Sequence, residues 1–230
     1  MNYFTADLHM HHKNRNGGIV ALCDRPYLDV DTMTEDIIIR NNSVVSDNDD
    51  VWDLGDVAFR CRPEEVADSL KRLNGRRHII LGNHDKALRQ AYIKGLLKDL
   101  IKSGKLEIIG GETAIYDSSL AVSKMLKIDG QNIFMSHYAC RTWPSAFRGT
   151  IHLFGHSHSN LPECEKSRSF DVGVDAWNFY PVSFRMVMAK IKDIDEGNSL
   201  KHKKPNDQFE DGTKLFHKDI KEFNLRYFGI

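Results

Sequence analysis

The chain has 230 residues, with 32 Lys or Arg against 32 Asp or Glu, so its formal net charge is zero at pH 7. This balance gives no overall attraction to nucleic acid or to an anionic membrane surface. Hydrophobic residues make up 41% of the chain, in short windows, which is typical of a globular fold and excludes a disordered polymer and a membrane-spanning helix.

Strands and helices alternate along the predicted N-terminal half. The chain starts without the basic region and long apolar stretch of a signal peptide, and its four cysteines form no C-x-x-C pair, so we expect free thiols in the cytoplasm. A buried strand is expected at 2–6, and a Thr-Met-Thr-Glu capping box predicts a helix from 32 to about 42. Further strands are expected at 50–54 and 78–81, followed by helices that end at about 73 and about 101. This alternation predicts an α/β protein.

The second half reads as β segments punctuated by glycine. The expected strands lie at 106–109, 112–116, 120–128, 132–136, 151–154 and 169–174. The apolar pattern at 181–191 fits either a helix or a last strand. After residue 192 the chain becomes polar and charged, and Phe216, Ile220, Phe223 and Tyr227 then recur at helical spacing. We therefore place a domain at 1–192 and, at 193–230, a charged linker and an amphipathic helix, which docks on its own domain or forms an oligomer contact.

Polar clusters follow the predicted strands. The chain carries D-x-H at 7–9, G-D at 55–56, G-N-H-D at 82–85, a single His137, and G-H-x-H at 155–158. Because ligands of open α/β sheets bind where loops follow the carboxyl ends of strands, we expect these clusters to meet at one rim. If the first strand continues through Asp7 and His9, both side chains leave the same face.

These clusters hold the donor atoms of a metal centre. They supply two carboxylates, one amide oxygen and four imidazoles: Asp7, Asp56, Asn83, His9, His137, His156 and His158. That set is enough for two adjacent ions sharing Asp56. Oxygen and nitrogen donors without thiolate favour Mn, Fe, Zn, Co or Ni over Mg or Ca.

Together the motifs resemble the calcineurin-like metallophosphoesterase superfamily, and within it small bacterial and phage-type phosphoesterases, from Tyr3 to about Pro181. Segments 23–27 and 172–177 share this resemblance. It implies a four-layer α-β-β-α sandwich of two mixed sheets. It also implies that one metal is bound by Asp7, His9, Asp56 and His158, and a second by Asp56, Asn83, His137 and His156. In such a site His84 protonates the leaving oxygen, Asp85 orients the His84 ring, and manganese is a common activator.

The departures from the family pattern bear on the substrate. Protein phosphatases of the superfamily follow G-D with Asp-Arg-Gly and use G-N-H-E, neither of which is present, so a phosphoprotein substrate is disfavoured. The segment Asp-Leu-His-Met-His-His also resembles the opening of polymerase-and-histidinol-phosphatase domains, in which His9 and His11 would both bind metal. That alternative leaves the G-N-H-D and G-H-S-H motifs unexplained.

The expected activity is hydrolysis of phosphoesters, with a preference for diesters of nucleotides or short single-stranded nucleic acid, because His84 can protonate a leaving alkoxide. A phosphomonoesterase acting on a small metabolite or nucleotide is the alternative, and a non-catalytic metal-dependent interaction module is the alternative from another class. Among the arginines near the motifs, Arg25 and Arg60 included, Arg141 is the best candidate for a phosphate contact. His12 is either a substrate-side residue or a surface residue.

Overall fold

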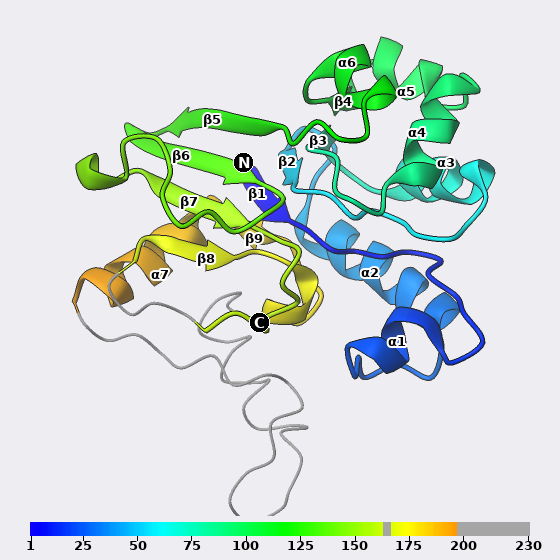
Figure 1. Ribbon diagram of the computed structural model, residues 1–230, viewed down its shortest axis with the longest axis horizontal. Coiled ribbons are helices and arrows are strands. Elements are labelled where there is room, and N and C mark those ends of the chain that lie inside the picture. Colours follow the sequence, from blue (N-terminus) through cyan, green and yellow to red (C-terminus); the bar gives the residue numbers. More distant parts are fainter. Residues whose placement is uncertain (163–166, 197–230) are drawn as a thin grey trace, which may run out of the picture.

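The computed structural model describes residues 1–162 and 167–196 (Figure 1). The predicted linker and C-terminal helix lie outside these residues, apart from the first few positions of the linker. The helices of the described part are α1 (Gly18–Leu22), α2 (Val30–Val44), α3 (Pro63–Arg72), α4 (Lys86–Ile93), α5 (Lys98–Lys102), α6 (Gly111–Tyr116) and α7 (Phe184–Asp195), with the 3-10 turns η1 (Ala146–Arg148) and η2 (Val174–Ala176). None of these helices is long and apolar enough to cross a membrane.

A five-stranded mixed sheet carries the N-terminal half. Its order is β4-β3-β2-β1-β9, formed by β4 (Leu106–Ile108), β3 (Arg76–Ile79), β2 (Asp50–Asp53), β1 (Asn2–Thr5) and β9 (Val182–Ser183). The first four strands are parallel and β9 runs antiparallel to β1. Helices α2, α3 and α4 bury their apolar residues against this sheet in one core that includes Met33, Val66 and Leu88. The carboxyl ends of β1, β2 and β3 therefore point to the same edge.

A four-stranded mixed sheet carries the second half. Its order is β5-β6-β7-β8, formed by β5 (Ser123–Ile128), β6 (Gln131–Ser136), β7 (Ile151–Phe154) and β8 (Ser169–Asp171). β5 and β6 form an antiparallel hairpin around the predicted turn at Asp129 and Gly130, whereas β6, β7 and β8 are parallel. The α/β class with two mixed sheets is thus confirmed.

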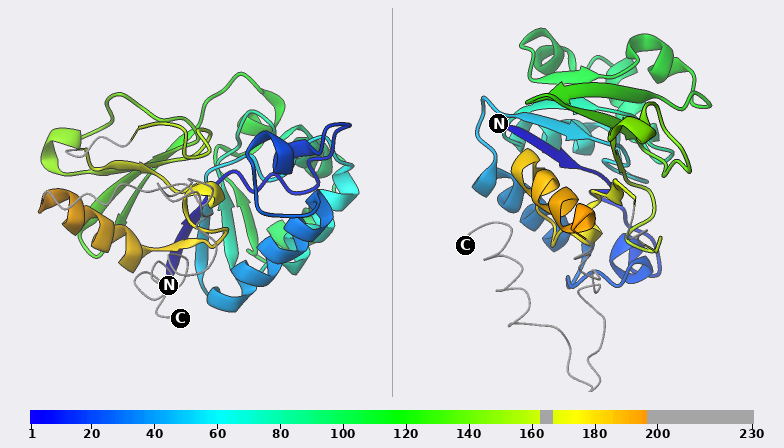
Figure 2. Two further views of the ribbon diagram at one scale, coloured as in Figure 1. Left: turned by 90° about the horizontal axis from the view of Figure 1, so that it is seen from below. Right: turned by 90° about the vertical axis from the view of Figure 1, so that its left-hand side faces the viewer.

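The second core lies between the two sheets. Alternate residues of the inner strands, such as Ile133, Met135 and Leu153, pack against Phe4 and Trp52 of the other sheet. Helix α7 adds Met186, Val187 and Ile191 to the same core, and Figure 2 shows this helix, in orange, beside the dark blue strand β1. Both sheets are fixed to one another by this apolar contact, so their loops form one rim.

Several local predictions were wrong in instructive ways. The segment predicted as a strand at 112–116 is helix α6, which starts after a left-handed Gly110 and buries Ala114 and Ile115. Helix α2 begins at Val30 because the Asp29 side chain accepts from the N–H of Thr32, so the cap is Asp29 and not Thr32. Segment 181–191, for which a helix and a strand were both open, contains one of each, since strand β9 leads directly into α7. The short helix α1 was not predicted.

Candidate metal centre

Candidate ligands sit on tight loops at the rim. Strand β1 ends at Thr5, and the backbone N–H groups of Asp7 and His9 then donate to the carbonyls of Gly55 and Asp56, each at 2.9 Å. The strand does not continue through these two residues, because both have left-handed backbone, with φ of 57° and 48°. The same conformation occurs at Asp56, His156 and His158. Left-handed backbone at non-glycine residues concentrates at functional sites, where the surroundings hold it in place.

Asp85 organises the loop that carries Asp56. Its two carboxylate oxygens accept from the backbone N–H groups of Asp56 at 2.9 Å, Val57 at 2.8 Å and Gly82 at 2.8 Å. Asp85 is fully buried, and burial, together with the nearby Asp56 carboxylate, raises its pKa to about 7. These backbone bonds replace the contact with the His84 ring that we expected, so Asp85 positions the loop and not the imidazole.

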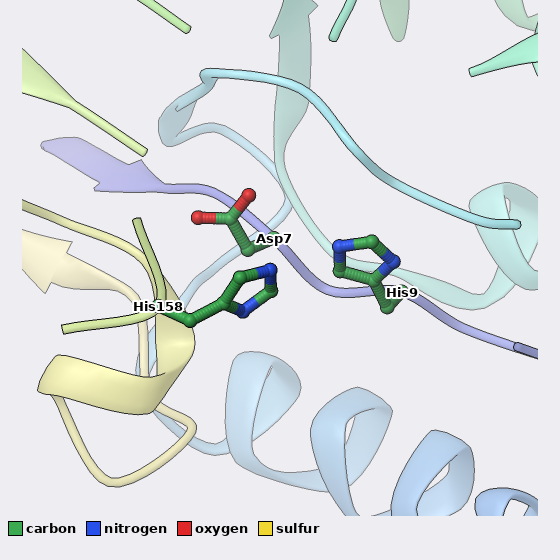
Figure 3. A group of neighbouring side chains, drawn as sticks. All are labelled: Asp7, His9 and His158. Carbon is green, nitrogen blue, oxygen red and sulfur yellow. The ribbon is translucent and has the colours of Figure 1, made fainter. Parts of the chain in front are cut away.

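The first group of candidate ligands consists of Asp7, His9 and His158, with one donor atom from each lying within 4.8 Å of the others. Figure 3 shows the His158 ring reaching from the segment after β7 toward Asp7 and His9, which leave the segment after β1. One oxygen of Asp7, Oδ2, accepts from the backbone N–H of His156 at 2.8 Å. Nδ1 of His158 lies 2.7 Å from Oδ2 of Asp175, so Nδ1 carries the proton and Nε2 is left to bind a metal.

The second group consists of Asp56, His137 and His156, again within 4.8 Å of one another. Oδ2 of Asp56 lies 3.5 Å from Nε2 of His137 and also 3.5 Å from Nε2 of His9, a member of the first group. The other oxygen of Asp56 accepts from the backbone N–H of His84 at 2.8 Å. A single carboxylate oxygen therefore lies between the two groups.

The tautomer of His137 leaves the lone pair of Nε2 facing the space between the two groups, where Oδ2 of Asp56 lies. Nδ1 of His137 lies 2.7 Å from the carbonyl oxygen of Leu54, which can only accept, so Nδ1 carries the proton. Burial lowers the pKa of His137, so the ring is neutral and Nε2 is an acceptor. This nitrogen faces Oδ1 of Asn83 at 2.9 Å. Asn83 therefore lies beside the second group, and its role as a metal ligand stays a prediction.

Burial makes this cluster costly without positive ions. Burial raises the pKa of Asp7 well above its ordinary value, and the neighbouring carboxylate of Asp171 adds to the increase. Burial lowers the pKa of His9, with a further contribution from Arg25, so the 3.5 Å approach of His9 to Asp56 is not an ion pair. Among the described residues, atoms left buried at this site without a hydrogen-bond partner are Oδ1 of Asp7, Oδ2 of Asp56 and both ring nitrogens of His9.

Unpartnered buried polar atoms of this kind are rare, because each costs about 1–3 kcal/mol. Those at Asp7, His9 and Asp56 face a common space, and carboxylate and imidazole donors suit divalent transition metals. The residues present therefore fit two metal ions, one at each group.

The remaining predicted site residues lie around the two groups. The half-buried His84 ring has its centroid 5.5 Å from that of His9 and 4.0 Å from that of Phe59. His12 is only 4% exposed, with its ring 5.4 Å from that of His9, so it is not a surface residue. Arg141 is exposed after β6, and its phosphate contact stays a prediction.

Three further residues near the site were not assigned their observed contacts from the sequence motifs. His11 bonds to the hydroxyl of Ser69 on α3 at 2.8 Å and belongs to neither group. Asp175, which fixes His158, was not singled out, although it lies in the segment 172–177 that shares the family resemblance. The exposed ring of Tyr138 lies edge-on to His156, with centroids 4.7 Å apart. Its position directly after His137 was the only signal in the sequence.

Replacing Gly82 with alanine should lower metal affinity. A Cβ atom at this position would meet Oδ1 of Asp56 at 2.2 Å and Cε1 of His137 at 2.8 Å, so the Asp56 carboxylate must shift. We expect weaker binding of the second ion in calorimetric titration with Mn²⁺.

Gly104→Ala is the matched control for this substitution. Unlike Gly82, Gly104 has a left-handed backbone, with φ of 74°, but no atom lies within 4 Å of the added Cβ. It should lose stability by about 1 kcal/mol and keep both ions. Equal metal affinity in Gly82→Ala and the wild-type protein would contradict the close approach of Gly82 to the ligands.

Comparison with known proteins supports the fold and names no activity. No protein-family profile matches the chain. An uncharacterised protein of Methanocaldococcus jannaschii is 27% identical over 196 residues, covering 83% of this chain and 90% of that protein. The gene 66 protein of Mycobacterium phage D29 is 26% identical over 215 residues, covering 85% and 98%. A crystal structure of a protein of unknown function from Aquifex aeolicus superposes with a TM-score of 0.58 at 23% identity, covering 82% and 98%. The chain is thus homologous to proteins without a named activity and shares the α/β fold of the Aquifex aeolicus protein.

Proposed function

We propose that this protein is a dinuclear metal-dependent phosphoesterase of the calcineurin-like type. The observation that carries the proposal is the position of Asp56, whose Oδ2 lies 3.5 Å from a ring nitrogen in each of the two groups. A carboxylate shared in this way would hold two ions close together, as in the two-metal sites that hydrolyse phosphate esters. Ions bound there would polarise the phosphoryl group and make hydroxide available near neutral pH. Manganese is our choice, with Fe, Zn, Co or Ni as alternatives.

His84 is the proposed general acid. Its backbone is fixed by the bond from its N–H to Asp56, and its half-buried ring stands beside His9 without being a member of either group. A ring held at the rim can donate a proton to the leaving oxygen of a bound ester. A diester has a poor alkoxide leaving group and gains most from this proton, so we favour diesters.

The surroundings of the rim support a nucleotide-like substrate. Tyr138 is 43% exposed beside His156, and an exposed aromatic ring offers a face on which a base can stack. Arg141 and His12 are the proposed substrate-side residues. We favour a short single strand or a nucleotide over a duplex, since the zero net charge of the chain gives no overall attraction to a long phosphate backbone.

Initial rates test the proposal directly. With Mn²⁺ added, we expect a higher kcat/KM for bis(p-nitrophenyl) phosphate than for p-nitrophenyl phosphate, and loss of both activities after chelation. A preference for the monoester would favour the phosphomonoesterase alternative. Failure of the pure protein to bind two transition-metal ions per chain would favour the non-catalytic interaction module. A cytoplasmic location and an oligomer contact through the C-terminal segment stay predictions.

A further inference from the structure

Arg25 is a completely buried arginine below the first group of ligands. It follows α1, and its side chain has 0% exposure. A buried guanidinium is stable only if its donors find acceptors. The N–H groups of Arg25 donate to a carboxylate and to backbone carbonyls, and not toward the space between the two ligand groups. This burial excludes Arg25 from the phosphate contacts that its place near the motifs had suggested.

The fork of Arg25 holds Asp175. Nε donates to Oδ1 of Asp175 at 2.8 Å and Nη2 donates to Oδ2 at 2.7 Å, which is a bidentate ion pair. Oδ2 of Asp175 is the same atom that accepts from Nδ1 of His158 at 2.7 Å. Arg25 therefore fixes the carboxylate that sets the orientation and the tautomer of His158.

The other side of the same guanidinium holds the segment after β1. Nη2 also donates to the carbonyl of Asp7 at 2.8 Å, and Nη1 donates to the carbonyl of Leu8 at 3.1 Å. These two carbonyls belong to the turn whose left-handed residues are Asp7 and His9. The Arg25 side chain thus holds the backbone between the candidate ligands Asp7 and His9. It also holds Asp175, which lies 150 positions away in the sequence and is the partner of the third ligand, His158.

We propose that Arg25 is a positioning residue that assembles the first metal group, holding the Asp7–His9 turn and, through Asp175, the His158 ring in binding geometry. The inference rests on the proposed metal centre but not on the proposed hydrolysis. It assigns a role to the segment 23–27, which the ligand motifs leave unexplained.

The chemistry of the side chains agrees with this geometry. The carboxylate of Asp175 accepts from the guanidinium of Arg25 on one side and from Nδ1 of His158 on the other. A lysine would keep the charge but not the planar fork, so it cannot reach Asp175 and the two carbonyls together. The substitution Arg25→Lys therefore separates the effect of the positive charge from the effect of the planar guanidinium.

Arg77, on strand β3, offers a matched control. It is also buried, at 4% exposure, and donates to Asp53 and to Asn41, both at 2.9 Å. It contacts no member of either ligand group. If metal affinity falls whenever a buried guanidinium is lost, it should fall in Arg77→Lys as well. If the loss is specific to the first group of ligands, it should appear in Arg25→Lys and not in Arg77→Lys.

Calorimetric titration of Mn²⁺ into the full chain tests the proposal. We expect the wild-type protein and Arg77→Lys to bind two ions, and Arg25→Lys to bind one ion normally and the other about 10–100-fold more weakly, the usual effect of losing a ligand's orienting partner. His158→Ala should weaken the same ion, and His156→Ala the other one. Normal affinity for both ions in Arg25→Lys, or equal losses in Arg25→Lys and Arg77→Lys, would overturn the proposal.

Asp175→Asn keeps the proposal testable if Arg25→Lys does not fold. This isosteric change leaves the two carbonyl bonds of Arg25 in place. It removes the charge and one acceptor oxygen at position 175, so it weakens both the fork of Arg25 and the link to His158, and it should weaken the same ion by a smaller factor. Unchanged affinity there would overturn the relay to His158. If the wild-type protein binds two ions but hydrolyses no phosphoester, the proposed function fails while the role of Arg25 stands.

Discussion

Asp56→Asn is expected to abolish the dinuclear centre. Oδ2 of Asp56 is buried, has no hydrogen-bond partner and lies 3.5 Å from nitrogens of both groups. An amide supplies one neutral oxygen and a donor N–H group, which cannot bridge two cations. We expect metal affinity to fall by more than the roughly 10–100-fold that outer partners contribute. Metal analysis of the purified variant, with calorimetry, measures this loss, and hydrolysis should fall with it.

Asp53→Asn is the control for this substitution. Asp53 is equally buried three residues earlier, but its carboxylate pairs with Arg77 and not with a candidate ligand. It should lower stability and leave two ions bound. Normal metal content in Asp56→Asn would show that the two groups do not share this carboxylate, and the observation that carries the proposed function would fall.

His84→Ala is expected to separate catalysis from metal binding. The ring belongs to neither ligand group, so the variant should keep two ions. Loss of a general acid costs about 10²–10⁴-fold in rate. We therefore expect a drop of that size in kcat for a diester with an alkoxide leaving group, such as a dinucleotide, and a smaller drop for bis(p-nitrophenyl) phosphate, because p-nitrophenolate leaves readily without a proton.

His11→Ala is the matched imidazole deletion. His11 bonds to Ser69 on α3 and lies outside both groups, so its loss should leave metal content and kcat unchanged. The same variant tests the alternative interpretation in which His11 binds metal. Wild-type hydrolysis by His84→Ala would remove His84 from the mechanism.

The sequence predicts the strands near the site well and the helices less well. Strands β1, β2, β4 and β7 match their predicted segments within about one residue at each end, because short apolar runs that end in Gly or Asp clusters are unambiguous. The segment at 112–116 was misassigned because its composition fits a strand, whereas packing on the adjacent core makes it α6. Tertiary contacts override weak local preference in this way.

The ligand types and their order along the chain are properties of the sequence by itself. Each cluster of His, Asp or Asn follows a strand, and parallel strands bring their carboxyl ends to one edge, so a site with these donors was predictable. Its internal geometry was not. Three features of this geometry depend on contacts between residues that are about 30 to 150 positions apart in the sequence. These are the position of Oδ2 of Asp56 between the two groups, the bonds of Asp85 to backbone, and the link that Arg25 makes between Asp7 and Asp175. Only the packing of the two sheets sets those distances, because local sequence fixes dihedral preferences and not the separation of remote loops.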